Sequence, residues 1–429
     1  MSCRAVLFAL VVVAPGFAED WPGWRGPRGD GSSREKAIPL KFSPTQNVRW
    51  SADIAGTGYS SPVVVGDRIF LTTCIEKEGE EDGDRVLICL DRRTGKETWR
   101  QVVVKAPLEQ KHSLNSYASA TPATDGERVY VSFLDKSAMQ VVCYAVDGKK
   151  LWQESPGKLL SVHGFCSSPI LHGNLVILNG DQDAKAYLVA LDKKTGVEKW
   201  RADRPKRKRS YCTPILIPDP VRKGKTQLVL SGGWRVTGYD ADTGKLLWLH
   251  EGPTEQYVAS LVYHQGILFL TAGFPEFHLM GIRPDGEGDI TGTKHVAWHI
   301  PHKMNGPRGA AYVPSPCAHD GHFFVVSDAG YLGCIEAKTG KRVYLKKLGR
   351  RHSASPILVE GNLFVPDDDG KVWVVKAGPK FEVVEKNDMK DPIFASPATA
   401  HGELFLRTTK KLFCIGGTTK PGERGVSTP

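Results

Sequence analysis

The chain has 429 residues, of which 41% are hydrophobic and 24% are charged, with a net charge of +10. This composition is typical of a globular protein with a large core and does not favour an intrinsically disordered chain. The length allows either several domains or one closed ring of repeats, so the order of elements along the chain must decide.

The first segment, 1–18, has the pattern of a secretory signal peptide. Arg4 precedes an apolar run from Ala5 to Ala14, and the small-residue sequence Pro15-Gly16-Phe17-Ala18 follows it. We therefore expect an exported protein, periplasmic or secreted. No later segment approaches the roughly 18 uninterrupted apolar residues of a membrane-spanning helix, so we expect no transmembrane segment.

Short apolar strands that follow Ser-Pro or Thr-Pro recur after an N-terminal extension, 19–46. They begin at Ser61, Thr121, Ser168, Thr213, Ser315, Ser355 and Ser396, and Ser260-Leu261 fills the remaining gap. Spacings of roughly 40 to 60 residues are those of propeller blades.

Each start is followed by the pattern of one blade. In the first unit, apolar strands at 63–65, 69–71 and 86–90 are separated by polar turns, and an Asp-x-x-Thr-Gly turn at 91–95 precedes Trp99. The turn and its Trp recur at 192–200 and 240–248. The pattern predicts four short antiparallel strands in each unit.

The two ends of the repeat region supply parts of one blade. Residues 394–415 contain three strands and precede a Gly, Thr and Pro-rich tail, 418–429, whereas 47–50 have the outer-strand pattern alone. Pairing of these pieces closes a ring and removes exposed sheet edges. We predict an all-β fold, an eight-bladed β-propeller over 47–417 whose N- and C-terminal strands share one blade.

The Asp-x-x-Thr-Gly-x-x-x-Trp turns and the Ser-Pro strand starts resemble repeats of the pyrroloquinoline-quinone (PQQ) type, over almost everything after Trp50. The leader Trp21-Pro22-Gly23-Trp24-Arg25-Gly26-Pro27 resembles that of secreted bacterial PQQ-repeat proteins. Families with this repeat include quinoprotein dehydrogenases and the noncatalytic outer-membrane assembly factor of the BamB type. The resemblance thus implies the fold and leaves the function open, because function resides in sites.

Catalytic members of the PQQ group, as the resemblance implies, hold the quinone with a vicinal cysteine pair, a stacking Trp and a calcium site of acidic and amide side chains. The sequence contains no Cys-Cys pair. Asp367-Asp368-Asp369-Gly370 is interpreted as a β-turn, since a calcium loop alternates its acidic ligands. We expect no cofactor and no metal, and PQQ with calcium remains an unsupported alternative.

Two further groups of residues receive structural interpretations. We expect the recurring tryptophans to pack blade against blade; they are Trp50, Trp99, Trp152, Trp200, Trp248 and Trp298. The basic cluster is interpreted as a solvated loop, and no nucleic-acid partner is expected; it contains Arg201, Arg204, Lys206, Arg207, Lys208 and Arg209.

Eight cysteines follow the leader segment, an even number that permits disulfides in an oxidising compartment. Cys89, Cys143, Cys334 and Cys414 occupy matching positions in different blades and should be buried apolar residues. The pairs to test for a disulfide are Cys74 with Cys89 and Cys166 with Cys212.

Loops that join an outer strand to the next inner strand gather around one mouth of a propeller's channel, and here they concentrate aromatic, His, Asn and Arg side chains. Aromatics among hydrogen-bonding groups suit a polar ligand with apolar faces, such as a sugar, a quinone or an extended peptide. The candidate ligand-binding residues are Tyr59, His112, Asn115, Tyr117, His163, Phe165, Tyr211, Tyr257, Asn305, Arg308, Tyr312, Arg351, His352 and Phe394.

No catalytic residue is assigned, since the usual hydrolase, zinc-protease and nucleotide-binding motifs are missing from the sequence. We favour a monomeric, noncatalytic binding or protein-interaction scaffold that takes a protein, a small polar ligand or a glycan at the channel mouth. The alternatives are a divergent PQQ-dependent oxidoreductase and an extracellular glycan-binding propeller.

Overall fold

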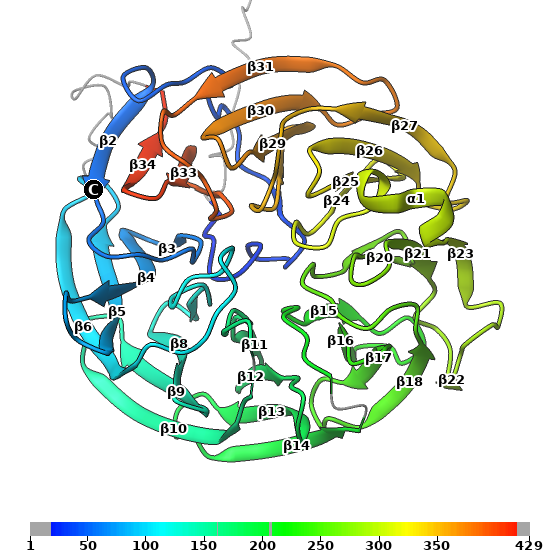
Figure 1. Ribbon diagram of the computed structural model, residues 1–429, viewed down its shortest axis with the longest axis horizontal. Coiled ribbons are helices and arrows are strands. Elements are labelled where there is room, and N and C mark those ends of the chain that lie inside the picture. The colour runs from blue at the N-terminus through cyan, green and yellow to red at the C-terminus, as the bar shows by residue number, and fades with distance from the viewer. Residues whose placement is uncertain (1–18, 161, 206–207, 418–429) are drawn as a thin grey trace, which may run out of the picture.

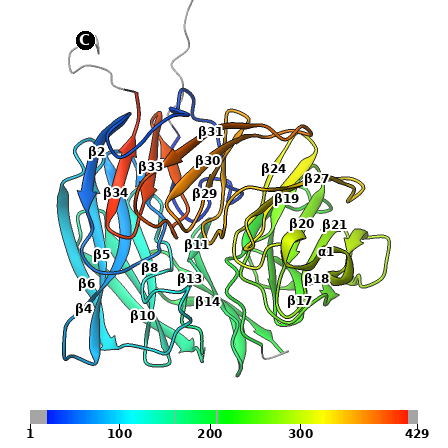
Figure 2. The same ribbon diagram turned by 45° about the horizontal axis from the view of Figure 1, so that its top comes forward.

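A computed structural model describes residues 19–160, 162–205 and 208–417, and these form eight sheets arranged as a ring around a central axis (Figure 1). The predicted all-β, eight-bladed propeller is therefore confirmed for the described residues. Figure 2 shows the same ring tilted, with the blades standing side by side around the axis. The predicted signal peptide, 1–18, and tail, 418–429, lie outside the described residues.

Each blade has four antiparallel strands, and two blades carry an added short strand. The first four blades, from the axis outward, are β3 (Val63–Val65), β4 (Arg68–Glu76), β5 (Asp82–Asp91) and β6 (Glu97–Pro107); β7 (Ala123–Thr124), β8 (Arg128–Asp135), β9 (Ala138–Ala145) and β10 (Lys150–Lys158); β11 (Ile170–His172), β12 (Leu175–Gly180), β13 (Ala186–Asp192) and β14 (Glu198–Arg204); and β15 (Ile215–Pro218), β16 (Thr226–Gly232), β17 (Arg235–Asp240) and β18 (Leu246–Glu251).

The remaining blades follow the same order. They are β19 (Val262–His264), β20 (Ile267–Ala272), β21 (His278–Ile282) and β23 (Val296–Ile300); β24 (Cys317–His319), β25 (His322–Val326), β26 (Tyr331–Glu336) and β27 (Arg342–Lys347); β28 (Ile357–Val359), β29 (Asn362–Pro366), β30 (Lys371–Lys376) and β31 (Val383–Asp388); and β32 (Ala398–Ala400), β33 (Glu403–Arg407), β34 (Lys411–Ile415) and β2 (Val48–Asp53). A helix, α1 (His302–Gly309), follows β23.

The last blade joins the two ends of the ring, as the sequence predicts. Strand β2 pairs antiparallel with β34, with Trp50 opposite Cys414 and Asp53 opposite Lys411. The pairing leaves neither end of the ring as an open sheet edge, which would otherwise expose unpaired backbone groups.

Five of the six recurring tryptophans pack against a turn glycine of the next blade, which confirms their structural interpretation. Trp248 differs, because its indole lies on Gly238 of its own blade and its Nε1 donates to Gln227 Oε1 at 2.9 Å. Trp50 lies against Gly95 in the turn of the next blade, where a Cβ atom would stand 2.4 Å from the indole, and its Nε1 donates to the Arg92 carbonyl at 2.8 Å. The same contact joins Trp99 to Gly148 and Trp298 to Gly340. Each turn thus needs a glycine because the neighbouring indole occupies the space of a side chain.

The Ser-Pro and Thr-Pro starts also have a common structural role. The backbone N–H of Ser61 donates to Thr121 Oγ1 at 3.0 Å, and the N–H of Thr121 donates to Ser168 Oγ at 2.9 Å. The same bond links Ser168 to Thr213, Ser260 to Ser315, Ser315 to Ser355 and Ser355 to Ser396. These residues form a belt of hydrogen bonds between successive blades, so the motif recurs because each blade must bond the next.

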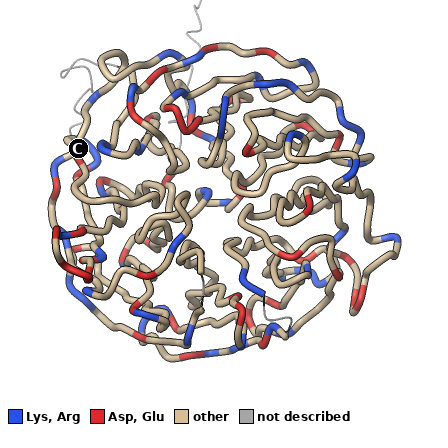
Figure 3. Tube along the Cα trace, viewed as in Figure 1, with Lys and Arg blue, Asp and Glu red and all other residues tan. Residues whose placement is uncertain are grey.

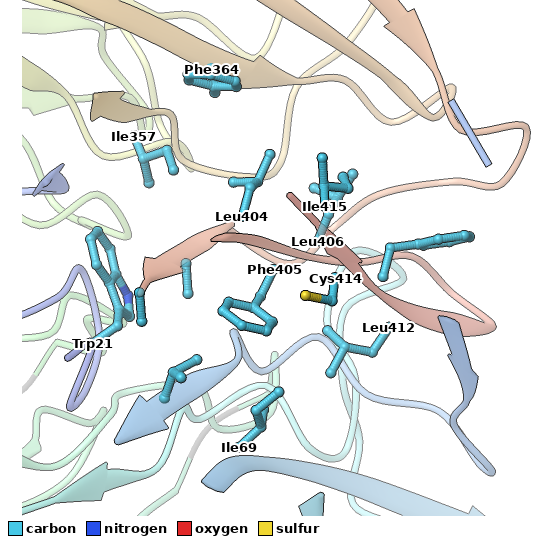
Figure 4. Packing of buried hydrophobic residues seen from close by; sticks show 14 of the residues in the cluster. Trp21, Ile69, Ile357, Phe364, Leu404, Phe405, Leu406, Leu412, Cys414 and Ile415 are labelled. Carbon is cyan, nitrogen blue, oxygen red and sulfur yellow. The ribbon is translucent and has the colours of Figure 1, made fainter. Parts of the chain in front are cut away.

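The N-terminal extension enters the centre of the ring, where its dark blue trace crosses the axis (Figure 1). Trp21 exchanges two backbone hydrogen bonds with Val64, at 2.7 and 2.9 Å, and β1 (Ser32–Ser33) pairs parallel with β28. The Trp21 side chain is buried in the cluster that contains Ile357 and Phe405 (Figure 4). The extension is therefore part of the packed core.

Two further features of the fold are a short added strand and the ion pairs of the basic cluster. Strand β22 (Gly288–Asp289), in the segment between β21 and β23, pairs parallel with β18 of the preceding blade. In the basic cluster, ion pairs join Arg204 to Asp181, Arg209 to Asp183, Lys208 to Glu255 and Arg201 to Glu198. Lys206 and Arg207 lie outside the described residues. Arg201 and Arg204 lie on β14, and Arg204 is buried against Asp181, so the solvated-loop interpretation is wrong for these two residues. Lys208 and Arg209 follow β14 in the loop that was expected.

The eight cysteines among the described residues are free, and neither proposed disulfide is present. Cys74 lies opposite Arg85 in the β4–β5 pair, while Cys89 lies opposite Phe70. Cys166 directs its thiol to the Tyr211 carbonyl at 3.7 Å. Cys89, Cys143, Cys334 and Cys414 are buried, as expected for small core residues.

Candidate binding site at the channel mouth

A cavity of about 360 Å³ lies in the channel where the loops between blades gather. We call it the mouth cavity. Seven of the predicted binding residues line it, namely Tyr59, His112, Asn115, His163, Tyr211, Tyr312 and Phe394. They come from loops that precede inner strands of different blades, so the ring closure is what brings these distant residues together.

Aromatic rings from several loops line the mouth cavity. The Tyr59 and Phe394 ring centroids are 4.7 Å apart, across the junction between the first and last blades. The His163 ring lies 5.7 Å from that of His112 and 6.0 Å from that of Tyr211. These tilted and edge-on contacts between neighbouring loops hold the rings in a defined arrangement.

Hydroxyl and amide groups lie between the rings. The hydroxyls of the blade starts line the cavity at Ser168, Thr213, Ser260, Ser355 and Ser396. Asn115 donates to the His163 carbonyl at 2.8 Å, and the Tyr312 hydroxyl donates to Gln256 Oε1 at 3.3 Å. Among the described residues that line the mouth cavity, none is Asp, Glu, Lys or Arg. Figure 3 likewise shows most charged residues away from the axis.

Two carboxylates behind the wall position the lining. Asp328 accepts the backbone N–H groups of Tyr312 at 2.6 Å and Val313 at 3.1 Å, and burial raises its pKa to about 6. Asp368 accepts the N–H of Ser353 at 2.7 Å, and burial raises its pKa as well. Because both carboxylates are engaged by loop backbone, they brace the site and do not enter the cavity.

A buried guanidinium likewise positions the loop that carries Tyr59. Arg407 on β33 donates to the carbonyls of Ser60 at 3.0 Å and Thr72 at 2.9 Å. Desolvation lowers the pKa of Arg407 to about 9. The guanidinium thereby ties the loop that carries Tyr59 to the neighbouring blade.

The other seven predicted residues lie outside the lining. Phe165 and Tyr257 are core residues, and His352 is buried with Nδ1 2.6 Å from the Pro366 carbonyl. Tyr117 lies beneath the Arg85 and Lys111 cations. Arg351 is 3.6 Å from Asp368. Asn305 and Arg308 belong to α1, where Asn305 Nδ2 bonds the Ile300 carbonyl and the Arg308 guanidinium covers the Tyr331 ring.

Trp24, Phe274 and Gln256 are among the lining residues that were not sequence candidates. Trp24 comes from the N-terminal extension, and its Nε1 donates to Ser260 Oγ at 3.3 Å. Phe274 lies in the turn between β20 and β21, with 46% of its surface exposed, and Gln256 precedes the buried Tyr257. Trp24 carries no repeat signal, and only its place in the leader sequence Trp-Pro-Gly-Trp distinguishes it.

The described residues bring no three His, Cys, Asp or Glu side chains into a cluster suited to a metal ion. Nor does any helix within the described ranges have the length and hydrophobicity needed to span a membrane.

Fold and site together define a closed β-propeller of PQQ-type repeats with an aromatic, uncharged cavity at one channel mouth. The family model described as "Outer membrane protein assembly factor BamB" matches residues 42–116, 83–262 and 291–378, more than half of the chain. The chain belongs to this family of PQQ-type propellers.

Two of the curated relatives match part of the chain. The outer membrane protein assembly factor BamB of Burkholderia pseudomallei (strain K96243) is 28% identical over 226 residues, which cover 50% of this chain and 49% of that protein. The quinohemoprotein alcohol dehydrogenase ADH IIB of Pseudomonas putida is 27% identical over 180 residues, covering 39% and 24%. The matched region therefore spans about a quarter to a half of these relatives.

Solved structures share the fold. The BamB structure from Moraxella catarrhalis has a TM-score of 0.60 at 11% identity and covers 87% of this chain and 98% of that one. The quinohemoprotein alcohol dehydrogenase ADHIIG from Pseudomonas putida HK5 has a TM-score of 0.65 at 13% identity, covering 96% and 82%. At these identities the likeness concerns the fold alone.

Proposed function

We propose that the protein is an exported, noncatalytic binding propeller that takes an uncharged ligand with apolar ring faces and hydrogen-bonding edges in the mouth cavity. The observation that carries the proposal is the lining itself, which combines aromatic rings with hydroxyl and amide groups and includes no charged side chain among the described residues. Rings stack on apolar ligand faces, and the hydroxyls bond ligand edges. An ionic ligand group would lose its hydration there without gaining a counter-charge.

Pyranose sugars have this combination of apolar faces and polar edges, so a neutral glycan is the ligand class that we favour. Tyr211 and Tyr312 supply rings on the wall, and Ser168, Thr213 and Ser260 supply hydroxyls between them. The volume of about 360 Å³ suits one or two sugar rings at the end of a longer chain.

The lining does not fit PQQ with calcium. Calcium takes six to eight oxygen ligands, usually including carboxylates, and the quinone's own carboxylates call for Lys or Arg. The mouth cavity offers neither kind of side chain among its described residues. Asp328 and Asp368 lie nearby, but Asp328 accepts the backbone N–H groups of Tyr312 and Val313, and Asp368 accepts the backbone N–H and the hydroxyl of Ser353. This misfit supports a binding function over an oxidoreductase.

A protein segment is the second candidate ligand. Phe274 at the cavity is 46% exposed, and Leu160 and Val162, in the loop that carries His163, are 49% and 42% exposed. Exposed apolar side chains beside a cavity are typical of protein contact surfaces. The similarity to a protein named as an outer membrane protein assembly factor also supports an interaction role.

The test measures binding of neutral oligosaccharides, namely maltohexaose, cellohexaose and chitohexaose, by calorimetry. We expect one of them to bind, and Tyr211→Ala with Tyr312→Ala to weaken it at least about tenfold, since each ring loses a stacking contact. Tyr331→Ala, outside the cavity, is the matched control. Failure of all three sugars to bind would exclude the glycan class.

A second experiment adds PQQ and calcium to the protein. It measures the absorbance of bound cofactor and follows dye reduction with alcohols as substrates. We expect neither cofactor binding nor turnover. Cofactor-dependent dye reduction would overturn the noncatalytic proposal and establish the oxidoreductase alternative.

A further inference from the structure

A second cavity, of about 400 Å³, lies on the other side of Trp24. One wall is the N-terminal extension from Pro22 to Asp30, and the other consists of the inner strands β7, β11, β15 and β19 with the residues just before them. We call it the inner-strand cavity. Trp24 lines both cavities and so separates the inner-strand cavity from the mouth cavity.

The inner strands present backbone hydrogen-bonding groups to the channel. In a hairpin with a two-residue turn, the residues next to the turn bond each other, and the preceding residue directs its N–H and C=O away from the hairpin. Val64 holds this position in β3, and the extension occupies both of its groups through Trp21. Leu358 holds it in β28 and donates its N–H to the Gly31 carbonyl at 2.8 Å.

Two further inner strands have the same hairpin form and line the inner-strand cavity. In β11, His172 pairs with Leu175, which places Leu171 at the outward position. In β19, His264 pairs with Ile267, which places Tyr263 there. Leu171 and Tyr263 both belong to the cavity wall. The extension thus hydrogen-bonds the edges of three inner strands, namely β3, β28 and β7, where the Thr124 N–H donates to the Pro22 carbonyl at 2.8 Å. The outward positions of β11 and β19 face the cavity.

We propose that the inner-strand cavity binds a short extended peptide, which adds a strand to β11 or β19 as the extension does on β3 and β28. The wall residues around these edges are mainly apolar, including Pro169, Ile170, Leu216 and Val262. The peptide class is therefore one with aliphatic side chains, held chiefly by main-chain hydrogen bonds. This site is separate from the mouth cavity and stands independently of the ligand proposed there.

The experiment uses the whole protein and the peptide acetyl-Lys-Val-Val-Val-Lys-amide, followed by calorimetry. We expect binding, and we expect a peptide N-methylated at all three valines to bind at least about tenfold more weakly, because it cannot donate to a strand edge. Equal binding of the two peptides, or no binding of the unmodified one, would overturn the proposal.

Variants locate the site. Leu171→Pro combined with Tyr263→Pro removes both outward N–H groups while leaving the hairpin bonds, and should weaken the peptide at least about tenfold. Leu171→Ala with Tyr263→Phe is the control and should bind nearly normally. If the proline variant does not fold, the comparison of the N-methylated with the unmodified peptide still tests the proposal. Loss of peptide binding in Tyr211→Ala with Tyr312→Ala would place the peptide in the mouth cavity and refute this site.

Discussion

The indole of Trp50, on the strand that closes the ring, lies directly on Gly95 in the turn of the following blade. A Cβ atom at Gly95 would stand 2.4 Å from Trp50 Cε3, and the Gly95 backbone has a φ of +72°. The contact couples the first complete blade to the blade that the two chain ends share.

Gly95→Ala should therefore destabilise the protein by about 3 kcal/mol, since the methyl overlaps the indole and the backbone is strained. Gly79→Ala is the control, because Gly79 has a φ of +79° with nothing within 4 Å of its missing Cβ. In urea unfolding, the free energy of unfolding should fall by about 1 kcal/mol for Gly79→Ala. Equal losses in both variants would mean that the indole contact contributes nothing.

The ring was predictable from the sequence because repeated residues make repeated local contacts. Asp91 accepts the Thr94 N–H at 2.8 Å and its hydroxyl at 2.7 Å, which closes the Asp-x-x-Thr-Gly turn within five residues. The contact between Trp50 and Gly95 is likewise made between neighbouring blades at a constant spacing. Such contacts leave a periodic trace in the sequence.

The candidate site was predictable only in part. Tyr211 and Tyr257 occupy corresponding loops of successive blades, yet Tyr211 lines the mouth cavity, whereas Tyr257 is fully buried and donates its hydroxyl to the Gly252 carbonyl at 2.9 Å. Residue type does not reveal which aromatic of a loop turns toward the core. Trp24 reaches the cavity from outside the repeats, so no periodic signal marks it.

The ring closure also depends on a buried carboxylate. Glu403 on β33 pairs with Arg49 on β2 and, at 2.6 Å, with Arg92 in the first complete blade, and its side chain is 3% exposed. Glu403→Ala should cost about 3 kcal/mol in urea unfolding, because it leaves a buried guanidinium without its main partner. Glu127→Ala breaks an exposed pair with Arg128 and should cost at most about 0.5 kcal/mol. A similar small loss for both variants would contradict this role of Glu403.

The buried carboxylate of Asp328 gives the stability a specific pH dependence. Because burial raises its folded pKa to about 6, the folded state binds a proton more tightly than the unfolded chain. The contribution of Asp328 to stability is thus fully present below the unfolded pKa, near 4, and is lost as the pH rises to about 6. As the pH falls from 7 to 4, the free energy of unfolding of the unsubstituted protein should rise by about 2 kcal/mol relative to that of Asp328→Asn.

Urea unfolding at a series of pH values checks this expectation. Asp242→Asn is the control, since its partners His172 and Lys225 lower the Asp242 pKa and the trend should be opposite. A pH-independent difference for Asp328→Asn would show that the Asp328 carboxyl titrates normally in the fold.

Trp24 should set the affinity of the mouth cavity although it lies outside the repeats. Its indole lines the cavity and is held by Ser260, so Trp24→Ala removes a stacking surface and joins the mouth cavity to the inner-strand cavity. We expect the neutral oligosaccharide to bind about tenfold more weakly, Trp24→Phe to retain most of the affinity, and Trp234→Ala, on a hairpin outside the lining, to bind normally. Calorimetry with the four proteins measures these affinities. If Trp24→Ala binds as tightly as the unsubstituted protein while Tyr211→Ala does not, the ligand contacts the cavity wall without reaching Trp24.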